Sequence, residues 1–273
     1  MSKVILITGA SSGIGKDAAI QLIKEGHKVY TAARRIEKMK ELQEMGGFPM
    51  QMDVAKNEDV KNVVDQILQK DGKIDVLWNN AGYGLYGSVE NISIAAAKKQ
   101  FEVNLFGLAN LTQKVLPYMR KAKSGTIINT SSMGGKMYTP LGAWYHATKH
   151  AVEGFSDCLR LETKQFNINV VVLEPGAIAT EFGDVLTQPM LDNCKNTAYE
   201  PMAKLVAKTV NDSYHKPNGA SPRSVITNII SKIVRSKKPK TRYRAGKWAK
   251  PMVWMRLYLG DRIFDKVIMN EVK

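Results

Sequence analysis

The 273-residue chain has few cysteines, no long apolar runs and, over its last quarter, few acidic residues. Two cysteines, Cys158 and Cys194, are too few for a disulfide framework and favour a reduced, cytoplasmic setting. The apolar run 4–7 after the N-terminus is too short for the core of a signal peptide. No uncharged apolar stretch approaches the ~18 residues of a membrane-spanning helix. We therefore expect neither an exported nor an integral membrane protein.

Two kinds of catalytic site are also missing. His27, His150 and His215 lack the spacing of metal ligands, so we expect no metal site. The sequence contains no Gly-x-Ser-x-Gly turn, which argues against a serine hydrolase.

What the sequence does contain is a regular alternation over its first 175 residues. Short β-branched runs predict strands, and the stretches between them have helical spacing. The expected strands are 4–8, 28–32, 49–52, 74–78, 126–129 and 168–173, and the expected helices are 14–25, 60–70, 95–120 and 145–166. This alternation predicts a doubly wound α/β fold, in which helices cover both faces of a parallel sheet.

The pattern changes after Pro175. Residues 176–222 have the composition of loops and helices and are expected to form a small helical cap. Ser221-Pro222-Arg223 resembles an N-cap with proline at the first helical position, opening a helix over 224–235. Residues 240–245 are a candidate last strand. No linker separates two domains, so we expect residues 1–273 to form one domain.

A glycine-rich turn follows the first strand, with the spacing Gly-x3-Gly-x-Gly. Glycine permits positive φ and close approach of a ligand to the backbone, and a helix N-terminus offers free N–H groups to a pyrophosphate. A tight turn without a ligand is the alternative. The candidate cofactor-binding residues here are Gly9, Ser11, Ser12, Gly13, Ile14 and Gly15.

The end of the second expected strand indicates which dinucleotide is preferred. A carboxylate there would favour NAD, but the sequence reads Thr31-Ala32-Ala33-Arg34-Arg35. Guanidinium groups suit a 2′-phosphate, so NADP(H) is favoured over NAD(H). A solvated arginine pair that opens the next helix is the alternative.

Tyr145 and Lys149 lie four residues apart in an expected helix, and therefore one turn apart on one face. A free phenol has a pKa near 10, and a neighbouring ammonium favours the phenolate and lowers that value. Such a pair suits general acid–base chemistry on an alcohol or ketone, although packing alone would also explain it.

Together with other motifs, this pair makes the chain resemble the short-chain dehydrogenase/reductase family, loosely its retinol and 17β-hydroxysteroid dehydrogenase branch. The matching elements fall in order over nearly 180 residues. They are Thr8-Gly-x3-Gly-x-Gly15, Asp53, Asn79-Asn80-Ala81-Gly82, Asn104, Ser132, Tyr145-x3-Lys149 and Pro175-Gly-x-Ile-x-Thr180. The resemblance implies a Rossmann-like oxidoreductase that transfers hydride between a nicotinamide cofactor and an alcohol, ketone or aldehyde.

The resemblance also implies catalytic roles. Tyr145 would donate or accept the proton, and Lys149 would lower its pKa and hold the nicotinamide ribose. Ser132, thirteen residues before Tyr145, would hydrogen-bond the substrate oxygen. Asn104 would hold a water that links Lys149 to solvent.

Further residues would bind the cofactor. Asp53, with Val54 beside it, would contact the adenine. The adenosine side of the cleft would be lined by Asn80, Ala81 and Gly82, and the nicotinamide pocket would be shaped by Pro175, Gly176, Ile178 and Thr180.

Large apolar side chains are the candidates for the substrate wall: Leu85, Tyr86, Met133, Tyr138, Leu141, Trp144, Phe182 and Val185. They predict a lipophilic substrate of steroid, retinoid or long-chain type, although ordinary packing of the cap would also explain them. Relatives usually pair through the helices at 95–120 and 145–166, so the resemblance implies a homo-oligomer.

The positive charge is concentrated at the C-terminus. Residues 201–273 hold 17 Lys and Arg against 4 Asp and Glu, which is +13 of the total +15. Within them, the basic extension 237–273 also contains Trp248, Trp254 and Tyr258. A solvated strand and a packed helix are favoured here, with peripheral contact to anionic lipid second and nucleic acid last.

Two other functions remain open from the sequence. One is a non-catalytic dinucleotide sensor or scaffold on the same fold, and the other is a peripheral membrane-binding protein.

Overall fold

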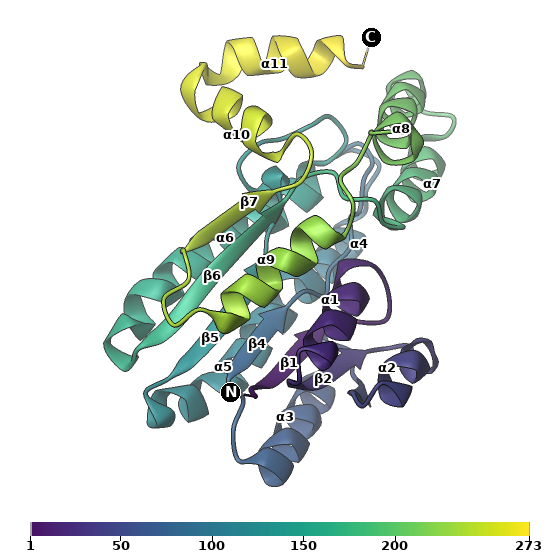
Figure 1. The fold of residues 1–273 in the computed structure, drawn as a ribbon. Coiled ribbons are helices and arrows are strands. Elements are labelled where there is room, and N and C mark those ends of the chain that lie inside the picture. The colour runs from purple at the N-terminus through teal and green to yellow at the C-terminus, as the bar shows by residue number, and fades with distance from the viewer. Residues whose placement is uncertain (1, 273) are drawn as a thin grey trace.

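A computed structural model describes residues 2–272 and contains one seven-stranded sheet flanked by helices (Figure 1). The strands are β1 (Val4–Thr8), β2 (Lys28–Ala33), β3 (Phe48–Gln51), β4 (Val76–Asn79), β5 (Gly125–Thr130), β6 (Ile168–Pro175) and β7 (Arg242–Ala245). All pairs are parallel, in the order β3-β2-β1-β4-β5-β6-β7. The predicted doubly wound α/β fold is confirmed.

Helices connect these strands and extend beyond the last one. They are α1 (Gly13–Lys24), α2 (Lys40–Glu44), α3 (Asn57–Asp71), α4 (Ile94–Phe101), α5 (Leu108–Ala122), α6 (Ala143–Thr163), α7 (Phe182–Cys194), α8 (Glu200–His215), α9 (Ser224–Arg235), α10 (Ala249–Tyr258) and α11 (Gly260–Asn270). Short 3₁₀ turns lie at η1 (Ile36–Met39), η3 (Met133–Gly135) and η4 (Lys164–Phe166), and a π-helical turn at η2 (Glu102–Gly107).

The two faces of the sheet have separate cores because side chains alternate along each strand. Ile5 and Ile7 of β1 belong to a cluster with α1, α2 and α9. Val4 and Leu6 belong to a cluster with α3, α5 and α6 on the opposite face. The strand order reverses between β1 and β4, which is where open α/β sheets bind ligands at the carboxyl ends of their strands.

The helix expected over 95–120 is present, and it runs without a break from α4 through the π-helical turn η2 into α5. Two other predicted details of the helices were wrong. Ser221 is not an N-cap, because its backbone pairs with Ala177 and Ala179 and the helix begins three residues later. The extension after β7 forms two helices, separated at Gly260, which has a φ of +76°.

Candidate active site

The glycine turn between β1 and α1 leaves the backbone of the helix N-terminus open. Gly9 and Gly13 have φ values of +67° and +58°, as the sequence predicts for such a turn. Gly15 has a different reason to be glycine, since a Cβ there would lie 2.6 Å from both the Asn80 side chain and the Gly9 carbonyl. Ser12, the N-cap of α1, makes no side-chain capping hydrogen bond. The first N–H groups of α1 are therefore available to an anionic ligand.

One cavity of about 1400 Å³ extends from this turn over the carboxyl ends of the strands to the C-terminal helices. Thr180 lies opposite the turn, with its Cγ2 3.6 Å from the position of a Cβ on Gly13. All the candidate cofactor-binding residues except Gly15 line the cavity: Gly9, Ser11, Ser12, Gly13, Ile14, Arg34, Arg35, Asp53, Val54, Asn80, Ala81, Gly82, Tyr145, Lys149, Pro175, Gly176, Ile178 and Thr180.

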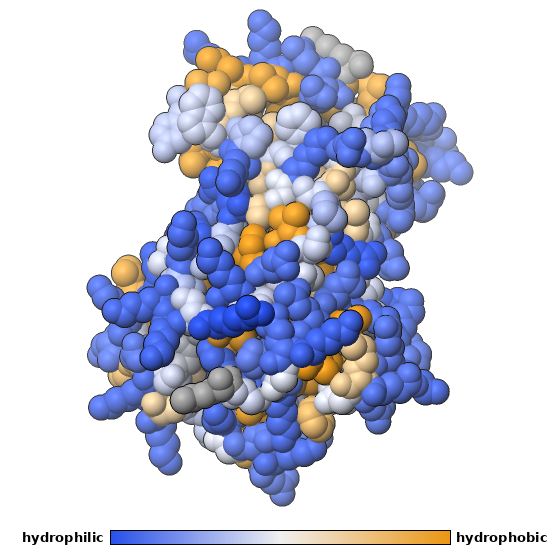
Figure 2. All heavy atoms as spheres, viewed as in Figure 1, coloured by the Kyte–Doolittle hydropathy of each residue, from blue (hydrophilic) through white to orange (hydrophobic). Residues whose placement is uncertain are grey.

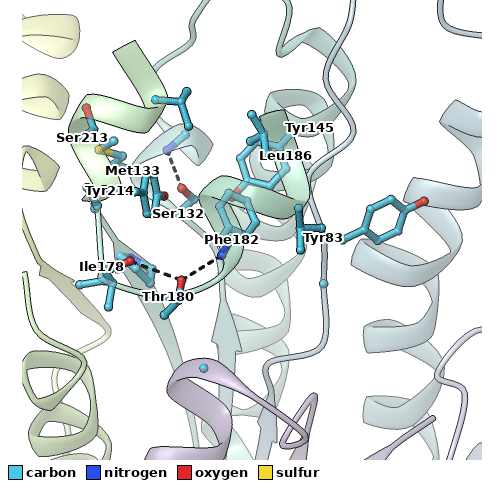
Figure 3. Close-up of a pocket in the computed structure, with 18 of the residues that line it drawn as sticks. Tyr83, Ser132, Met133, Tyr145, Ile178, Thr180, Phe182, Leu186, Ser213 and Tyr214 are labelled. Atoms are coloured by element: carbon cyan, nitrogen blue, oxygen red, sulfur yellow. Dashed lines mark hydrogen bonds between the residues drawn. The ribbon is translucent and has the colours of Figure 1, made fainter. Parts of the chain in front are cut away.

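Ser132, Tyr145 and Lys149 also line this cavity. Ser132 caps η3 in an extended conformation, and its Oγ accepts a hydrogen bond of 3.0 Å from the Gly134 N–H (Figure 3). Tyr145 and Lys149 are one turn apart on α6, and both are buried. The Lys149 Nζ donates to the Thr130 carbonyl at 2.9 Å and lies 5.9 Å from the centre of the Tyr145 ring.

Burial determines the protonation of both groups on α6. It raises the pKa of Tyr145 to about 12, against a smaller lowering by the Ser132 hydroxyl. Burial also lowers the pKa of Lys149 to about 8, while Glu153 opposes that change. At pH 7 the chain alone thus carries a protonated phenol and a charged ammonium.

Asn104 lies in the π-helical turn and is buried behind the cavity wall. Its Oδ1 accepts from the Tyr83 N–H at 3.0 Å, and its Nδ2 donates to the Tyr83 carbonyl at 2.9 Å and to Thr148 Oγ1 at 3.1 Å. A Cβ on Gly82 would be 3.1 Å from the Asn104 Oδ1 and 3.6 Å from the Lys149 Nζ. Asn104 therefore lies near Lys149 without lining the cavity itself.

His146 supports the loop that carries Ser132. Its Nδ1 lies 2.9 Å from the Gly134 carbonyl, and its Nε2 accepts the Thr139 N–H at 3.1 Å. Burial lowers its pKa to about 4, so the ring is neutral at pH 7 and bridges two segments of the loop.

The far half of the cavity combines many apolar side chains with polar ones from α8, such as Lys208, Asp212 and Ser213. Met133, Phe182, Tyr86 and Val185 line it as predicted, and Figure 3 shows Met133 and Phe182 with Leu186 and Tyr214 around Ser132 and Tyr145. Sequence reasoning did not find the other apolar residues of this half, which come from α7, α8, α10 and α11. They are Leu186, Leu205, Val206, Val210, Tyr214, Met252, Met255, Val267 and Ile268.

Four candidate wall residues lie elsewhere: Leu85, Tyr138, Leu141 and Trp144 do not line the cavity. Trp144 precedes Tyr145 on a helix and so points about 100° away from it. The Tyr138 ring packs 5.2 Å from that of Phe264, and its hydroxyl donates to Asp265 at 2.8 Å. Tyr138 therefore anchors α11 instead of contacting a ligand.

A family model described as short chain dehydrogenase matches residues 3–190. The chain belongs to the short-chain dehydrogenase/reductase family. Such a chain is an oxidoreductase that acts on a small molecule with a nicotinamide dinucleotide as cofactor.

Two curated members of the family align with most of this short-chain dehydrogenase/reductase. The 3-ketodihydrosphingosine reductase of Bacteroides thetaiotaomicron is 39% identical over 245 residues, covering 89% of this chain and 88% of the relative. Retinol dehydrogenase 8 of Bos taurus is 32% identical over 268 residues, covering 93% and 85%.

Solved structures of the family have the same architecture. A short-chain dehydrogenase from Streptomyces avermitilis has a TM-score of 0.82 at 29% identity, covering 98% of this chain and 96% of its own. The closed form of a serine dehydrogenase complexed with NADP⁺ has a TM-score of 0.71 at 27% identity, covering 85% and 89%.

In the described part of this family member, metal-binding clusters and helices that could cross a membrane are both absent. Within residues 2–272, no group of three or more His, Cys, Asp or Glu side chains is placed to hold a metal ion. None of the helices in the same range has the length and apolar character needed to cross a membrane.

The basic C-terminal quarter of this short-chain dehydrogenase/reductase is held to the sheet by buried ion pairs. Arg242 of β7 contacts Glu153 at 3.0 Å and Asp157 at 2.6 Å on α6, and Glu174 on β6 at 3.2 Å. Arg244 contacts Glu174 at 2.5 Å. Because Glu153 and Glu174 are almost fully buried, these arginines neutralise charges that water cannot reach.

Proposed function

We propose that the protein interconverts an alcohol and a ketone or aldehyde, using NADP(H) and a lipophilic substrate. One observation carries the proposal: Ser132 and Tyr145 lie in the same cavity as the glycine turn, beside its apolar half. A carbonyl bound there would contact an acid, and its apolar body would face α7 and α8.

The residues at the glycine turn fit a dinucleotide. Gly9 and Gly15 let the turn pack closely on Ala81 and Asn80, because a Cβ at either glycine would lie within 2.8 Å of that segment. The turn thus brings the N-terminus of α1 to the cavity, where its N–H groups favour the negative charge of a pyrophosphate. When bound, a nicotinamide cofactor supplies or accepts the hydride. Pro175, Gly176, Ile178 and Thr180 would shape the pocket of its ring.

The chain's own residues would handle the proton. The protonated Tyr145 hydroxyl would donate to the carbonyl oxygen during reduction and accept the alcohol proton during oxidation. The Ser132 hydroxyl would hydrogen-bond the same oxygen and stabilise its developing charge. The Lys149 ammonium would favour the phenolate that remains after proton donation, and Asn104 would hold a water that connects Lys149 to solvent.

The preference for NADP(H) rests on Arg34 and Arg35. Both are exposed, line the cavity and follow β2, where no carboxylate is present. Their guanidinium groups suit a 2′-phosphate, which NADP has and NAD lacks. The NADP⁺ bound to the serine dehydrogenase neighbour supports this assignment.

We expect Arg34→Ala to weaken NADPH binding about 30-fold and to change NADH binding less than threefold. A hydrogen bond to a charged group contributes about 2 kcal/mol, and only NADPH offers the 2′-phosphate. Fluorescence titration of bound nicotinamide measures both affinities. Arg262→Ala, on α11, is the matched control. Tighter binding of NADH than NADPH by the unaltered protein would refute the preference.

A lipophilic substrate is supported by the apolar side chains of α7, α8, α10 and α11 in the far half of the cavity. The names of the two curated relatives, which specify 3-ketodihydrosphingosine and retinol, agree with it.

We expect kcat/KM to rise along a series of ketones of increasing chain length. Each methylene buried in the cavity contributes about 0.8 kcal/mol, which is about fourfold, until the apolar half is full. Initial rates of NADPH consumption with methyl ketones, sugars and hydroxy acids check this. A preference for sugars or hydroxy acids would exclude a lipophilic substrate.

A further inference from the structure

The hairpin of α10 and α11 has apolar side chains on both sides. Its inner side chains Val253, Phe264 and Ile268 pack against Met137, and Met252, Met255 and Val267 face the cavity. Its outer surface exposes a second apolar group at the turn between the helices, consisting of Trp254, Leu257, Tyr258, Leu259 and Ile263. We call these five residues the hairpin tip.

The hairpin tip is too exposed to contribute to the fold. Tyr258 is 72% exposed and Trp254 is 55% exposed, and their rings lie 5.9 Å apart. Figure 1 shows α10 and α11 at the end of the molecule beyond the carboxyl edge of the sheet, and Figure 2 shows apolar spheres over α11 there, with hydrophilic groups beside them. Contiguous exposed apolar surface of this kind marks an interaction site.

Charge around the hairpin tip indicates the kind of partner. Both acidic groups of α11 near the tip are bound within the chain, since Asp261 pairs with Arg256 at 2.8 Å and Asp265 accepts from Tyr138. Arg262 and Lys266 on the same helix are exposed and form no ion pair with any residue in 2–272. The neutral Tyr138 hydroxyl leaves the charge of Asp265 in place, but the four basic residues of α10 and α11 outnumber these two acidic ones, so the two helices have a net charge of +2 beside exposed Trp and Tyr.

We propose that the hairpin tip docks on the surface of a bilayer that contains anionic phospholipid. Trp and Tyr are the aromatic residues that favour the boundary between lipid and water, and Arg and Lys beside them attract anionic headgroups. A second copy of the chain would have the same positive charge at this surface, which opposes pairing of two tips.

The position of the hairpin would connect the lipid surface to the cavity. The helices that would touch lipid also line the apolar half of the cavity, so a lipophilic molecule would reach the cavity without crossing much water. This last step rests on the proposed function, whereas the docking itself does not.

The chain contains its own control for charge. The run Lys237, Lys238 and Lys240 precedes β7. It therefore lies at the amino ends of the strands, whereas the hairpin lies beyond their carboxyl ends (Figure 1). If net charge alone attracted the protein to vesicles, removing charge from the lysine run or from α11 would weaken binding equally. Docking through the hairpin tip needs only Arg262 and Lys266.

Flotation with vesicles of phosphatidylcholine, with and without phosphatidylglycerol, tests the proposal on the full chain. We expect binding to the anionic vesicles, weakened about 25-fold by Arg262→Gln with Lys266→Gln, since each basic residue near the surface contributes roughly a factor of five. Trp254→Ser with Tyr258→Ser should weaken it tenfold or more by removing roughly 100 Å² or more of buried apolar area. Lys237→Gln with Lys238→Gln, and Leu161→Ser on α6, should leave it unchanged.

Three results would overturn the docking. The first is that the protein does not bind anionic vesicles, and the second is that the two charge variants lose equal amounts of binding. The third is that replacing Trp254 and Tyr258 changes the sedimentation of the protein but not its binding to vesicles. Circular dichroism of each variant excludes loss of the fold. Tyr145→Phe should float as the unaltered protein does, so failure of the enzymatic proposal would be seen separately.

Discussion

Replacing Tyr145 with phenylalanine is expected to lower kcat about 10³-fold and to change the affinity for NADPH less than twofold. General acid–base catalysis contributes about 10² to 10⁴ in rate, and Tyr145 is the acid placed in the cavity beside Ser132. The substitution removes only the hydroxyl, so the ring keeps its contacts with Tyr86 and Phe182. Single-turnover reduction of a ketone, followed by the absorbance of NADPH, measures the loss.

Tyr86→Phe is the matched control for this substitution. Its ring lies 5.7 Å from that of Tyr145, and its hydroxyl lies 3.4 Å from His146. We expect less than a tenfold change in kcat, because this hydroxyl holds no proton of the reaction. A Tyr145→Phe variant with more than a tenth of the original kcat would show that the proton comes from another group. An unaltered protein that binds NADPH but reduces no carbonyl would be a dinucleotide sensor.

Replacing Arg242 with methionine is expected to lower the free energy of unfolding by about 2 to 3 kcal/mol at pH 8, the contribution of a hydrogen bond to a charged group. Removing Arg242 leaves Glu153 with Lys136 and Glu174 with Arg244 as their remaining partners, so the loss is smaller than for an isolated buried ion pair. Arg242 contacts Glu153, Asp157 and Glu174, and two of these carboxylates are almost fully buried. Urea denaturation measures the change.

This loss should shrink as the pH falls. Burial raises the pKa of Glu174 above its ordinary value, and the nearby Arg244 and Arg242 reverse only part of that rise. Without Arg242 the folded pKa rises further, so the folded state takes up protons at a higher pH than the unfolded chain does. Acidification therefore favours the folded variant, and its deficit at pH 5 should be smaller than at pH 8.

Arg160→Met is the control for charge removal. Arg160 pairs with Asp157 three residues earlier on α6, where both side chains reach water, and such pairs contribute about 1 kcal/mol or less. An Arg242→Met deficit below about 1 kcal/mol, or one that is equal at pH 5 and pH 8, would show that Glu153 and Glu174 are compensated by other groups.

Much of the sheet was predictable because its strands are short apolar runs bounded by turns. The predicted 4–8 agrees with β1, and the predicted helix at 224–235 agrees with α9. The π-helical turn within 95–120 was not visible, because its apolar spacing differs little from that of the helices around it. The error at Ser221 had a similar cause, since its backbone pairs with a segment more than 40 residues away.

The candidate site divides in the same way. The glycine turn, Ser132, Tyr145 and Lys149 form local motifs, and the structure brings them to one cavity. The apolar half is assembled from distant segments, since Tyr86, Met252 and Ile268 line one cavity but lie in three parts of the chain. No local pattern indicates that α10 and α11 fold back over the carboxyl edge of the sheet. Tyr138 was misplaced for this reason, since its partners Phe264 and Asp265 belong to α11.

The apolar half of the cavity is built from chain segments that contribute no strand to the sheet. It is lined by α7 and α8, inserted between β6 and α9, and by α10 and α11, which follow the last strand. The glycine turn and Tyr145 are held by β1, α1 and α6, which lie outside both segments. During divergence, these two segments can change length and side chains while the machinery for the cofactor and the proton is inherited unchanged. A descendant of this chain can thus acquire a new substrate without rebuilding its redox chemistry.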